Sequence, residues 1–172
     1  MEDLFEQPLL TQLAEQLLIK NETIAIAESV TSGMLQQALS CCPNAARFYE
    51  GGITTYNLDQ KAKHLHIDRE HAAAVNCVSQ QVADEMALQV SELFNSSWGI
   101  GVTGYASPVP ESGNELFAYY AVACDGSIQF HGKISANEAD VTVVQQSYAQ
   151  YILMKFNYEL ANNMQVEKNP GV

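Results

Sequence analysis

Basic residues are scarce in this 172-residue sequence. Eight lysines and arginines stand against twenty aspartates and glutamates, which gives a net charge of −12. A nucleic-acid surface needs a basic face that neutralises phosphates, and an acidic chain stays away from anionic lipid headgroups. The composition therefore argues against nucleic-acid and membrane partners, and we expect a small-molecule partner instead.

Long apolar runs and targeting signals are also missing. No apolar run approaches the roughly 18 residues of a membrane-spanning helix, and the acidic start MEDLFEQPLL lacks the positive region of a secretory signal. We therefore expect a cytoplasmic protein whose four cysteines stay reduced. The cysteines form no C-x-x-C pair, and adjacent Cys41 and Cys42 make a poor metal clip.

Two common nucleotide and nucleophile motifs are absent, namely the P-loop lysine and the G-x-S-x-G elbow. A G-x-G-x-x-G string does occur at Gly99, Gly101 and Gly104. The dinucleotide fingerprint follows a strand and opens a helix, whereas Ile100 and Val102 make this string itself strand-like. We interpret its glycines as allowing a close backbone contact.

The length suits one domain with a sizeable core, which we place at residues 3–164, with 165–172 as a frayed tail. Hydrophobic periodicity predicts helices over residues 4–20, 34–39, 57–65, 78–94 and 141–160, and strands over 23–27, 47–56, 98–102, 116–123 and 128–134. Helices and strands alternate early and a hairpin comes late. This order is typical of an α/β fold, a three-layer α/β/α sandwich with a mixed sheet.

Hydroxyl side chains crowd the turn where the strand at 23–27 feeds the helix at 34–39. Ser29, Thr31 and Ser32 lie there. Ligands of open α/β sheets bind beyond the carboxyl ends of the strands, and a helix N-terminus offers N–H groups to a phosphate or an oxyanion. The alternative is that Thr31 or Ser32 simply caps the helix, and the spacing alone favours capping.

Positive and titratable side chains gather between residues 61 and 71. This basic cluster holds three of the eight basic residues and three of the four histidines: Lys61, Lys63, His64, His66, Arg69 and His71. Such a cluster can focus an anionic ligand, or it can be a solvated helix face. Both interpretations stay open, and His64 with His66 does not make a metal site.

A lysine near a serine suggests nucleophilic catalysis. A desolvated lysine amine can be neutral and take the proton of a serine hydroxyl. Tyr56 and Lys61 flank the start of the helix at 57–65. The topology permits Ser29 and Lys61 to meet, because both follow strands at their carboxyl ends, although the sequence alone does not show a contact.

Four segments, in order along the chain, resemble the CinA C-terminal domain family, the nicotinamide mononucleotide amidohydrolases. A-E-S-V-T-S-G at 27–33 resembles the family's A-E-S-C-T-G-G, and Y-E-G-G-I-T-T-Y at 49–56 with Lys61 resembles F-x-G-G-x-x-x-Y-x-x-x-x-K. V-N-C-V-S at 75–79 and V-T-G-Y-A-S-P at 102–108 are similar to G-A-V-S and T-G-I-A-G-P. Four ordered matches are far more specific than any one alone.

The resemblance implies a three-layer α/β fold and hydrolysis of an amide on a nicotinamide nucleotide, with release of ammonia and with no metal or other cofactor. Ser29 would be the nucleophile, Lys61 its base and Tyr56 a supporting residue. The implied substrate-binding residues are Glu28, Thr31, Ser32, Gly33, Gly52, Thr103 and Gly104. The family domain often follows an N-terminal partner domain, whereas we expect this chain to stand alone, and assembly into a homo-oligomer is left open.

The chain departs from the family pattern around the expected substrate. Val30 replaces a cysteine, Ser32 a glycine and Leu58 an asparagine, and the glycine-rich stretch after Pro108 is replaced by V-P-E-S-G-N. The family's closing helix begins with arginines, and residues 137–151 contain none. We therefore keep two alternatives beside the family reaction: a hydrolase with another substrate, and a non-catalytic nucleotide-binding relative.

Overall fold

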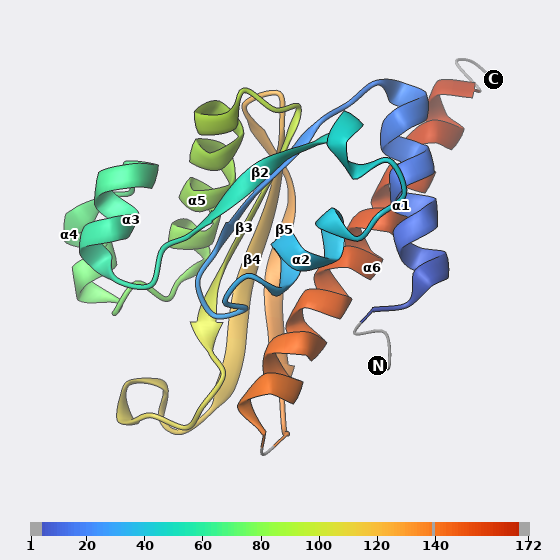
Figure 1. Cartoon of the computed structure of the whole chain (residues 1–172). Coiled ribbons are helices and arrows are strands. Elements are labelled where there is room, and N and C mark those ends of the chain that lie inside the picture. The colour runs from blue at the N-terminus through green and yellow to red at the C-terminus, as the bar shows by residue number, and fades with distance from the viewer. Residues whose placement is uncertain (1–4, 139, 169–172) are drawn as a thin grey trace.

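A computed structural model describes residues 5–138 and 140–168 of the chain, with side chains up to residue 162. Its centre is one five-stranded sheet with the strand order β2-β1-β3-β4-β5 (Figure 1). The strands are β1 (Ile24–Glu28), β2 (Tyr49–Thr54), β3 (Trp98–Tyr105), β4 (Leu116–Cys124) and β5 (Ser127–Ala136). The first three are parallel, and β4 and β5 continue the sheet as an antiparallel hairpin, so the sheet is mixed.

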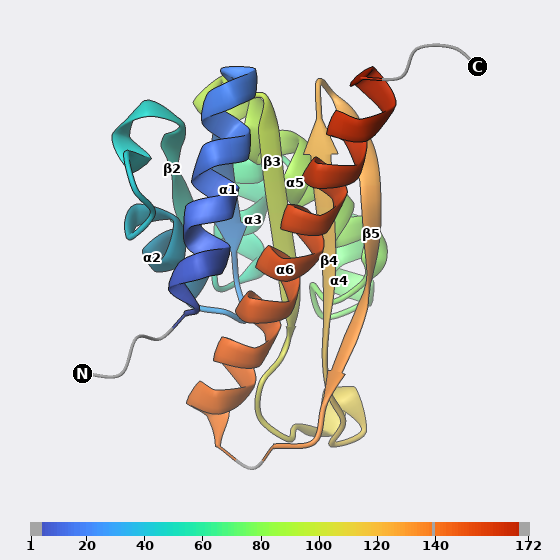
Figure 2. The same ribbon diagram turned by 90° about the vertical axis from the view of Figure 1, so that its right-hand side faces the viewer.

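Helices cover both faces of this sheet. On one face lie α1 (Gln7–Lys20), α2 (Met34–Ser40) and α6 (Val141–Lys168), and on the other α3 (Leu58–Leu65), α4 (Arg69–Ala74) and α5 (Gln80–Phe94) (Figures 1 and 2). Two short 3-10 helices, η1 (Ala45–Arg47) and η2 (Pro110–Ser112), lie in the connections. The expected three-layer α/β/α sandwich with a mixed sheet is confirmed.

Strand β1, which lies between β2 and β3, is buried on both faces, which explains its apolar sequence from Ile24 to Ala27. Ile24 and Ile26 point into the main core, which β1 and β3 form with α1, α2 and α6. Ala25 and Ala27 point to the opposite face and pack in a second cluster with side chains of α5. Both helical layers therefore hold β1 in place, and with it the residues that follow its carboxyl end.

The glycines of β3 let α5 approach the sheet closely. A Cβ on Gly99 would lie 2.1 Å from the carbonyl oxygen of Ala87, and one on Gly101 would lie 2.4 Å from that of Ala83. The G-x-G-x-x-G string lies inside β3 and opens no helix. Its interpretation as a close backbone contact, with no dinucleotide fingerprint, is confirmed.

The element boundaries differ from the sequence prediction in several places, three of which concern β2, α4 and α6. β2 begins at Tyr49, because the chain before it forms η1. Helix α4 was not predicted; Asp68 caps it by accepting hydrogen bonds from two backbone N–H groups of its first turn. α6 extends to Lys168, beyond its expected end at residue 160, and residues 169–172 of the expected tail lie outside the described residues.

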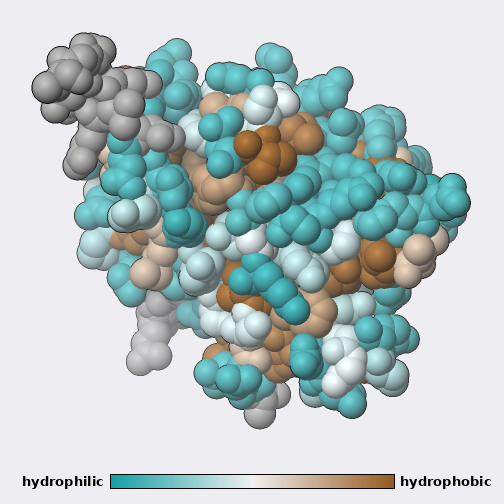
Figure 3. All heavy atoms as spheres, turned by 180° about the vertical axis from the view of Figure 1, so that it is seen from behind, coloured by the Kyte–Doolittle hydropathy of each residue, from teal (hydrophilic) through white to brown (hydrophobic). Residues whose placement is uncertain are grey.

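The face of the molecule opposite to that in Figure 1 is covered mostly by hydrophilic side chains, and hydrophobic ones appear in separate patches (Figure 3). Among the helices that the structure describes, none is both long and apolar enough to cross a bilayer.

Candidate active site

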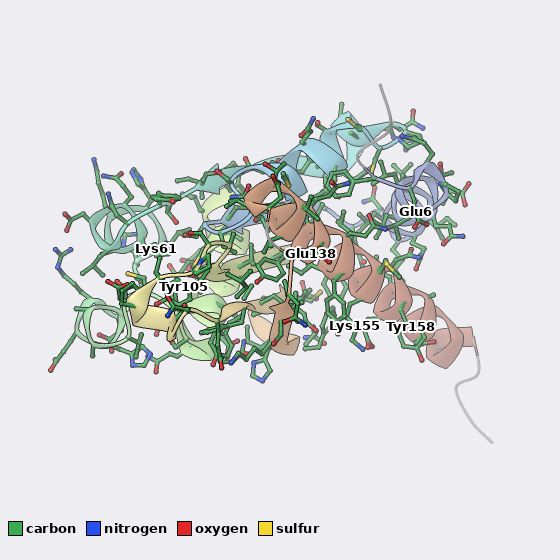
Figure 4. The ribbon with its side chains drawn as sticks, turned by 90° about the horizontal axis from the view of Figure 1, so that it is seen from below. Glu6, Lys61, Tyr105, Glu138, Lys155 and Tyr158 are labelled. Carbon is green, nitrogen blue, oxygen red and sulfur yellow. The ribbon has the colours of Figure 1, made fainter. Side chains whose placement is uncertain are left out.

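The carboxyl ends of the three parallel strands meet at one edge of the sheet. Ala27 of β1 lies between Ile53 of β2 and Gly101 of β3, so the three strands end close together. A cavity of about 420 Å³ opens there, within the roughly 300–1,000 Å³ typical of small-molecule sites. Lys61 and Tyr105 both line it (Figure 4).

Ser29 and Lys61 meet in this cavity. Ser29 directly follows β1, and Lys61 lies on α3, whose N-terminus Asn57 fixes by accepting a hydrogen bond from the Gln60 N–H at 3.0 Å. The Lys61 amine donates hydrogen bonds to Ser29 Oγ at 2.8 Å and to the Thr55 carbonyl oxygen at 2.6 Å. Only 1% of Lys61 and 8% of Ser29 is exposed. The contact that the topology permitted is therefore made in the structure.

The surroundings of Lys61 lower the pKa of its amine. Burial lowers the pKa of the amine from 10.5 to about 8, and the nearby Cys77 opposes this by raising it. Burial in turn raises the pKa of the Cys77 thiol, and Lys61 lowers it. With a pKa near 8, about one lysine in ten is neutral at pH 7, and the neutral form can take a proton from a hydroxyl.

The N-terminus of α2 is occupied by a carboxylate of the chain itself. Glu28 is completely buried, and it accepts hydrogen bonds from the N–H groups of Gly33 at 3.1 Å, Leu35 at 3.2 Å and Gln36 at 2.8 Å. Its fourth donor is the hydroxyl of Thr31. These N–H groups, which were expected to hold a phosphate or an oxyanion, instead hold Glu28.

The capping prediction was wrong for the same reason. The N-cap of α2 is Gly33, with a φ of 101°, and no side chain of the cap residue bonds to the helix. Thr31 turns inward to Glu28, and Ser32 is exposed with a φ of 53°. Glu28, at the end of the preceding strand, accepts the N–H hydrogen bonds that a capping hydroxyl would otherwise accept.

The other expected substrate-binding residues divide between the cavity and the core. Thr103 and Gly104 line the cavity, and the Thr103 hydroxyl donates to the Cys77 carbonyl oxygen at 2.8 Å. Gly52 lies in β2, where a Cβ would be 2.7 Å from the Ile26 carbonyl oxygen and from Gln36. Gly52 therefore makes room for packing against α2.

Tyr56 lies at the rim of the cavity with 78% of its surface exposed. The structure separates the basic cluster of residues 61–71. Lys61 turns into the cavity, whereas Arg69 forms an ion pair with Asp59 on the surface and His71 Nε2 lies 2.9 Å from Ser79 Oγ. Apart from Lys61, the cluster does not line the cavity.

Several cavity residues were not among the candidate site residues predicted from the sequence. Cys77 and Glu111 lie in connecting segments, and Val141 and Gln145 come from the first two turns of α6. Gln145 Nε2 donates to the Val30 carbonyl oxygen at 2.9 Å, which ties α6 to the turn after Ser29. In the part of the chain that the structure describes, no three His, Cys, Asp or Glu side chains are placed to hold a metal ion together.

Comparison with known proteins identifies the family of this chain. The family model of the CinA C-terminal domain matches residues 6–158. The chain belongs to the CinA C-terminal domain family. A CinA-like protein from Cyanothece is 35% identical over 103 residues, which cover 60% of this chain and 25% of that protein. A putative competence-damage inducible protein from Streptococcus agalactiae is 37% identical over 94 residues, 55% of this chain and 22% of that protein.

The chain thus spans about a quarter of the length of these curated family relatives. Solved structures match it over almost its whole length. A CinA superfamily protein from Klebsiella pneumoniae has a TM-score of 0.85 and 25% identity, covering 91% of this chain and 98% of that chain. One from Enterobacter cloacae has a TM-score of 0.84 and 26% identity, covering 93% and 98%.

Proposed function

We propose that this chain hydrolyses the carboxamide of a small molecule and releases ammonia, with Ser29 as nucleophile and Lys61 as its base. The observation that carries the proposal is the buried contact of 2.8 Å between Lys61 Nζ and Ser29 Oγ at the wall of a ligand-sized cavity. A serine hydroxyl is a weak nucleophile until a neighbouring base takes its proton, and Lys61 has the pKa and the position to do so. The resemblance to nicotinamide mononucleotide amidohydrolases supports the same reaction.

In the acylation step, the neutral Lys61 amine takes the proton of Ser29 as Oγ attacks the amide carbonyl carbon. A C–O bond forms, and the carbonyl oxygen becomes an oxyanion. When the tetrahedral intermediate collapses, the C–N bond breaks and Lys61 passes its proton to the leaving nitrogen, which departs as ammonia. An ester of Ser29 remains, and Lys61 is again neutral.

In the deacylation step, water replaces the departed ammonia. Lys61 takes a proton from this water, and the hydroxide oxygen attacks the ester carbonyl carbon. The C–O bond to Ser29 breaks, Oγ recovers a proton from Lys61, and the acid product leaves. The hydrogen bond to the Thr55 carbonyl oxygen keeps the amine pointed at Oγ throughout both steps.

Backbone N–H groups next to the nucleophile suit the developing oxyanion. Among the described residues, no hydrogen bond uses the N–H of Val30 or Thr31. Val30 directly follows Ser29 and lines the cavity, so we assign the oxyanion to its N–H. The N–H groups further along are already bonded, as Gly33 is to Glu28.

Ammonia release tests the proposal. Purified protein is incubated with a panel of carboxamides, including nicotinamide mononucleotide, and ammonia is measured for the wild type and for Ser29→Ala. We expect release from at least one amide, its loss in Ser29→Ala, and an acyl adduct on Ser29 by mass spectrometry after rapid quenching. Ligand binding without ammonia from any amide would favour the non-catalytic alternative.

A further inference from the structure

The cavity offers no free cation to a phosphate group. Of the residues that line it, Lys61 is the one cation, and its amine is directed at Ser29 and the Thr55 carbonyl oxygen. A carboxylate, Glu111, lines the same cavity from η2. A phosphate dianion placed here would meet one buried amine that the reaction needs and one negative charge.

Two helix N-termini at the cavity are also occupied by carboxylates, and a third, that of α3, is capped by Asn57 and carries Asp59 in its first turn. A helix N-terminus is the usual backbone site for phosphate. At α2 that place is taken by Glu28, and at α6 it is taken by Asp140, which accepts hydrogen bonds from the Thr142 N–H at 2.8 Å and the Val143 N–H at 3.1 Å. Each helix end already holds a negative charge, so each repels a second one.

The same features favour a positive charge. Glu111 attracts a cation by direct charge interaction. Tyr56 and Tyr105 line the cavity, and an aromatic ring face attracts a cation that lies within about 6 Å of its centre. A planar, permanently cationic ring that carries a carboxamide meets both requirements, and its amide can then face Ser29.

We propose that the substrate is a cationic, non-phosphorylated carboxamide of the pyridinium-nucleoside class, and that Glu111 selects it against the corresponding phosphate ester. This inference rests on the proposed amide hydrolysis by Ser29. A pyridinium nucleoside carries one positive charge, whereas its 5′-phosphate carries a net negative charge at neutral pH. The cavity volume of about 420 Å³ suits a molecule of nucleoside size.

The experiment compares nicotinamide riboside with nicotinamide mononucleotide as probes at low ionic strength. We expect kcat/KM for ammonia release to favour the riboside by roughly tenfold or more, and added salt to reduce this preference. Glu111→Gln should reduce the preference, and Glu111→Lys should reverse it. Glu115→Gln is the matched control, because Glu115 is exposed nearby and does not line the cavity.

Binding separates this inference from the reaction on which it rests. Calorimetry with Ser29→Ala measures the affinity for both probes without turnover. If the wild type releases no ammonia but Ser29→Ala binds the riboside more tightly, the proposed hydrolysis fails and the charge selectivity stands. Tighter binding or faster turnover of the mononucleotide, binding of neither probe, or a ratio that Glu111→Lys leaves unchanged would overturn the selectivity.

Discussion

Lys61 Nζ lies 2.8 Å from Ser29 Oγ, although 32 positions separate the two residues in the sequence. Two separate local structures bring them together: Ser29 directly follows β1, and Lys61 lies one turn into the helix that follows β2. Because β1 and β2 are parallel neighbours, their carboxyl ends deliver both side chains to the same edge of the sheet.

Removing the nucleophile should abolish turnover and leave the fold intact. We expect Ser29→Ala to lower kcat by roughly four orders of magnitude, as is typical for a nucleophile. The side chain lost is small, so the thermal midpoint should change little. The matched control is Ser40→Ala at the exposed end of α2, which should keep its full rate. Near-wild-type ammonia release from Ser29→Ala would rule out the covalent mechanism.

The lysine should act as a base and not as a fixed charge. Lys61→Arg keeps the charge but cannot give up its proton, so we expect it to be as inactive as Lys61→Ala. In the wild type, only the neutral amine is active, and its pKa is lowered to about 8. A plot of kcat/KM against pH should therefore rise about tenfold per unit below pH 8 and level off above it.

A different outcome would reassign the lysine. An active Lys61→Arg variant, or a profile that is flat from pH 6 to 9, would show that Lys61 only holds the substrate. Lys63→Arg serves as the control, because Lys63 is exposed on the same helix and does not line the cavity.

For the Ser29–Lys61 pair, the sequence predicted the positions of the two residues in the fold but not their contact. Strand and helix periodicity placed both residues after parallel strands, because burial imposes a regular pattern on the sequence. Whether two side chains touch depends on helix position and strand register, which periodicity does not encode. The chemistry of a lysine near a serine and the resemblance to a family suggested the pair, and the structure shows the contact.

The role of Glu28 was not predicted correctly. The resemblance implied that it binds the substrate, whereas in the structure it accepts hydrogen bonds from the N-terminus of α2. A buried carboxylate that caps the following helix has no sequence pattern as clear as Ser or Thr at an N-cap. Residues such as Gln145 were missed for another reason: α6 lies more than a hundred positions beyond Ser29 and reaches the cavity only through tertiary packing.

Glu28 should therefore be a stability residue. Glu28→Gln puts an amide N–H₂ against backbone N–H donors and removes charged hydrogen bonds that each contribute roughly 1.5–3 kcal/mol. We expect the free energy of unfolding to fall by about 3 kcal/mol in urea titrations. Glu50→Gln, at an exposed position of β2, is the control and should change the free energy of unfolding by less than about 0.5 kcal/mol. An unchanged midpoint for Glu28→Gln would contradict the capping role.

Two glycine variants should separate packing from backbone strain. In Gly101→Ala the new Cβ would lie 2.4 Å from the Ala83 carbonyl oxygen, so α5 must move away from the sheet. We expect a loss of about 3 kcal/mol or more. Gly113→Ala meets nothing within 4 Å but has a φ of 65°, and should cost about 1 kcal/mol through strain alone. Equal thermal midpoints for the two variants would refute the close-packing explanation.

Charge at the start of α6 should control whether a phosphate is accepted. Val141, the first residue of this helix, is 43% exposed and lines the cavity. The resemblance implies arginines at the beginning of this helix, and residues 137–151 contain none. An arginine there could form a paired, charged hydrogen bond to a phosphate. Such a bond contributes roughly 1.5–3 kcal/mol, so kcat/KM for nicotinamide mononucleotide should rise by about ten- to a hundredfold in Val141→Arg.

Val143→Arg is the matched control for this gain. Val143 lies two residues further along the same helix and is 46% exposed, but it does not line the cavity. Val143→Arg adds the same charge to an acidic protein. A general electrostatic effect would therefore raise kcat/KM equally in both variants, and this increase would disappear at high salt. A gain confined to Val141→Arg would show that the wild type handles the mononucleotide poorly because this contact is missing. If Val141→Arg does not raise kcat/KM for the mononucleotide while the protein still hydrolyses another amide, the segment from Tyr105 to Asn114 limits activity on the mononucleotide instead.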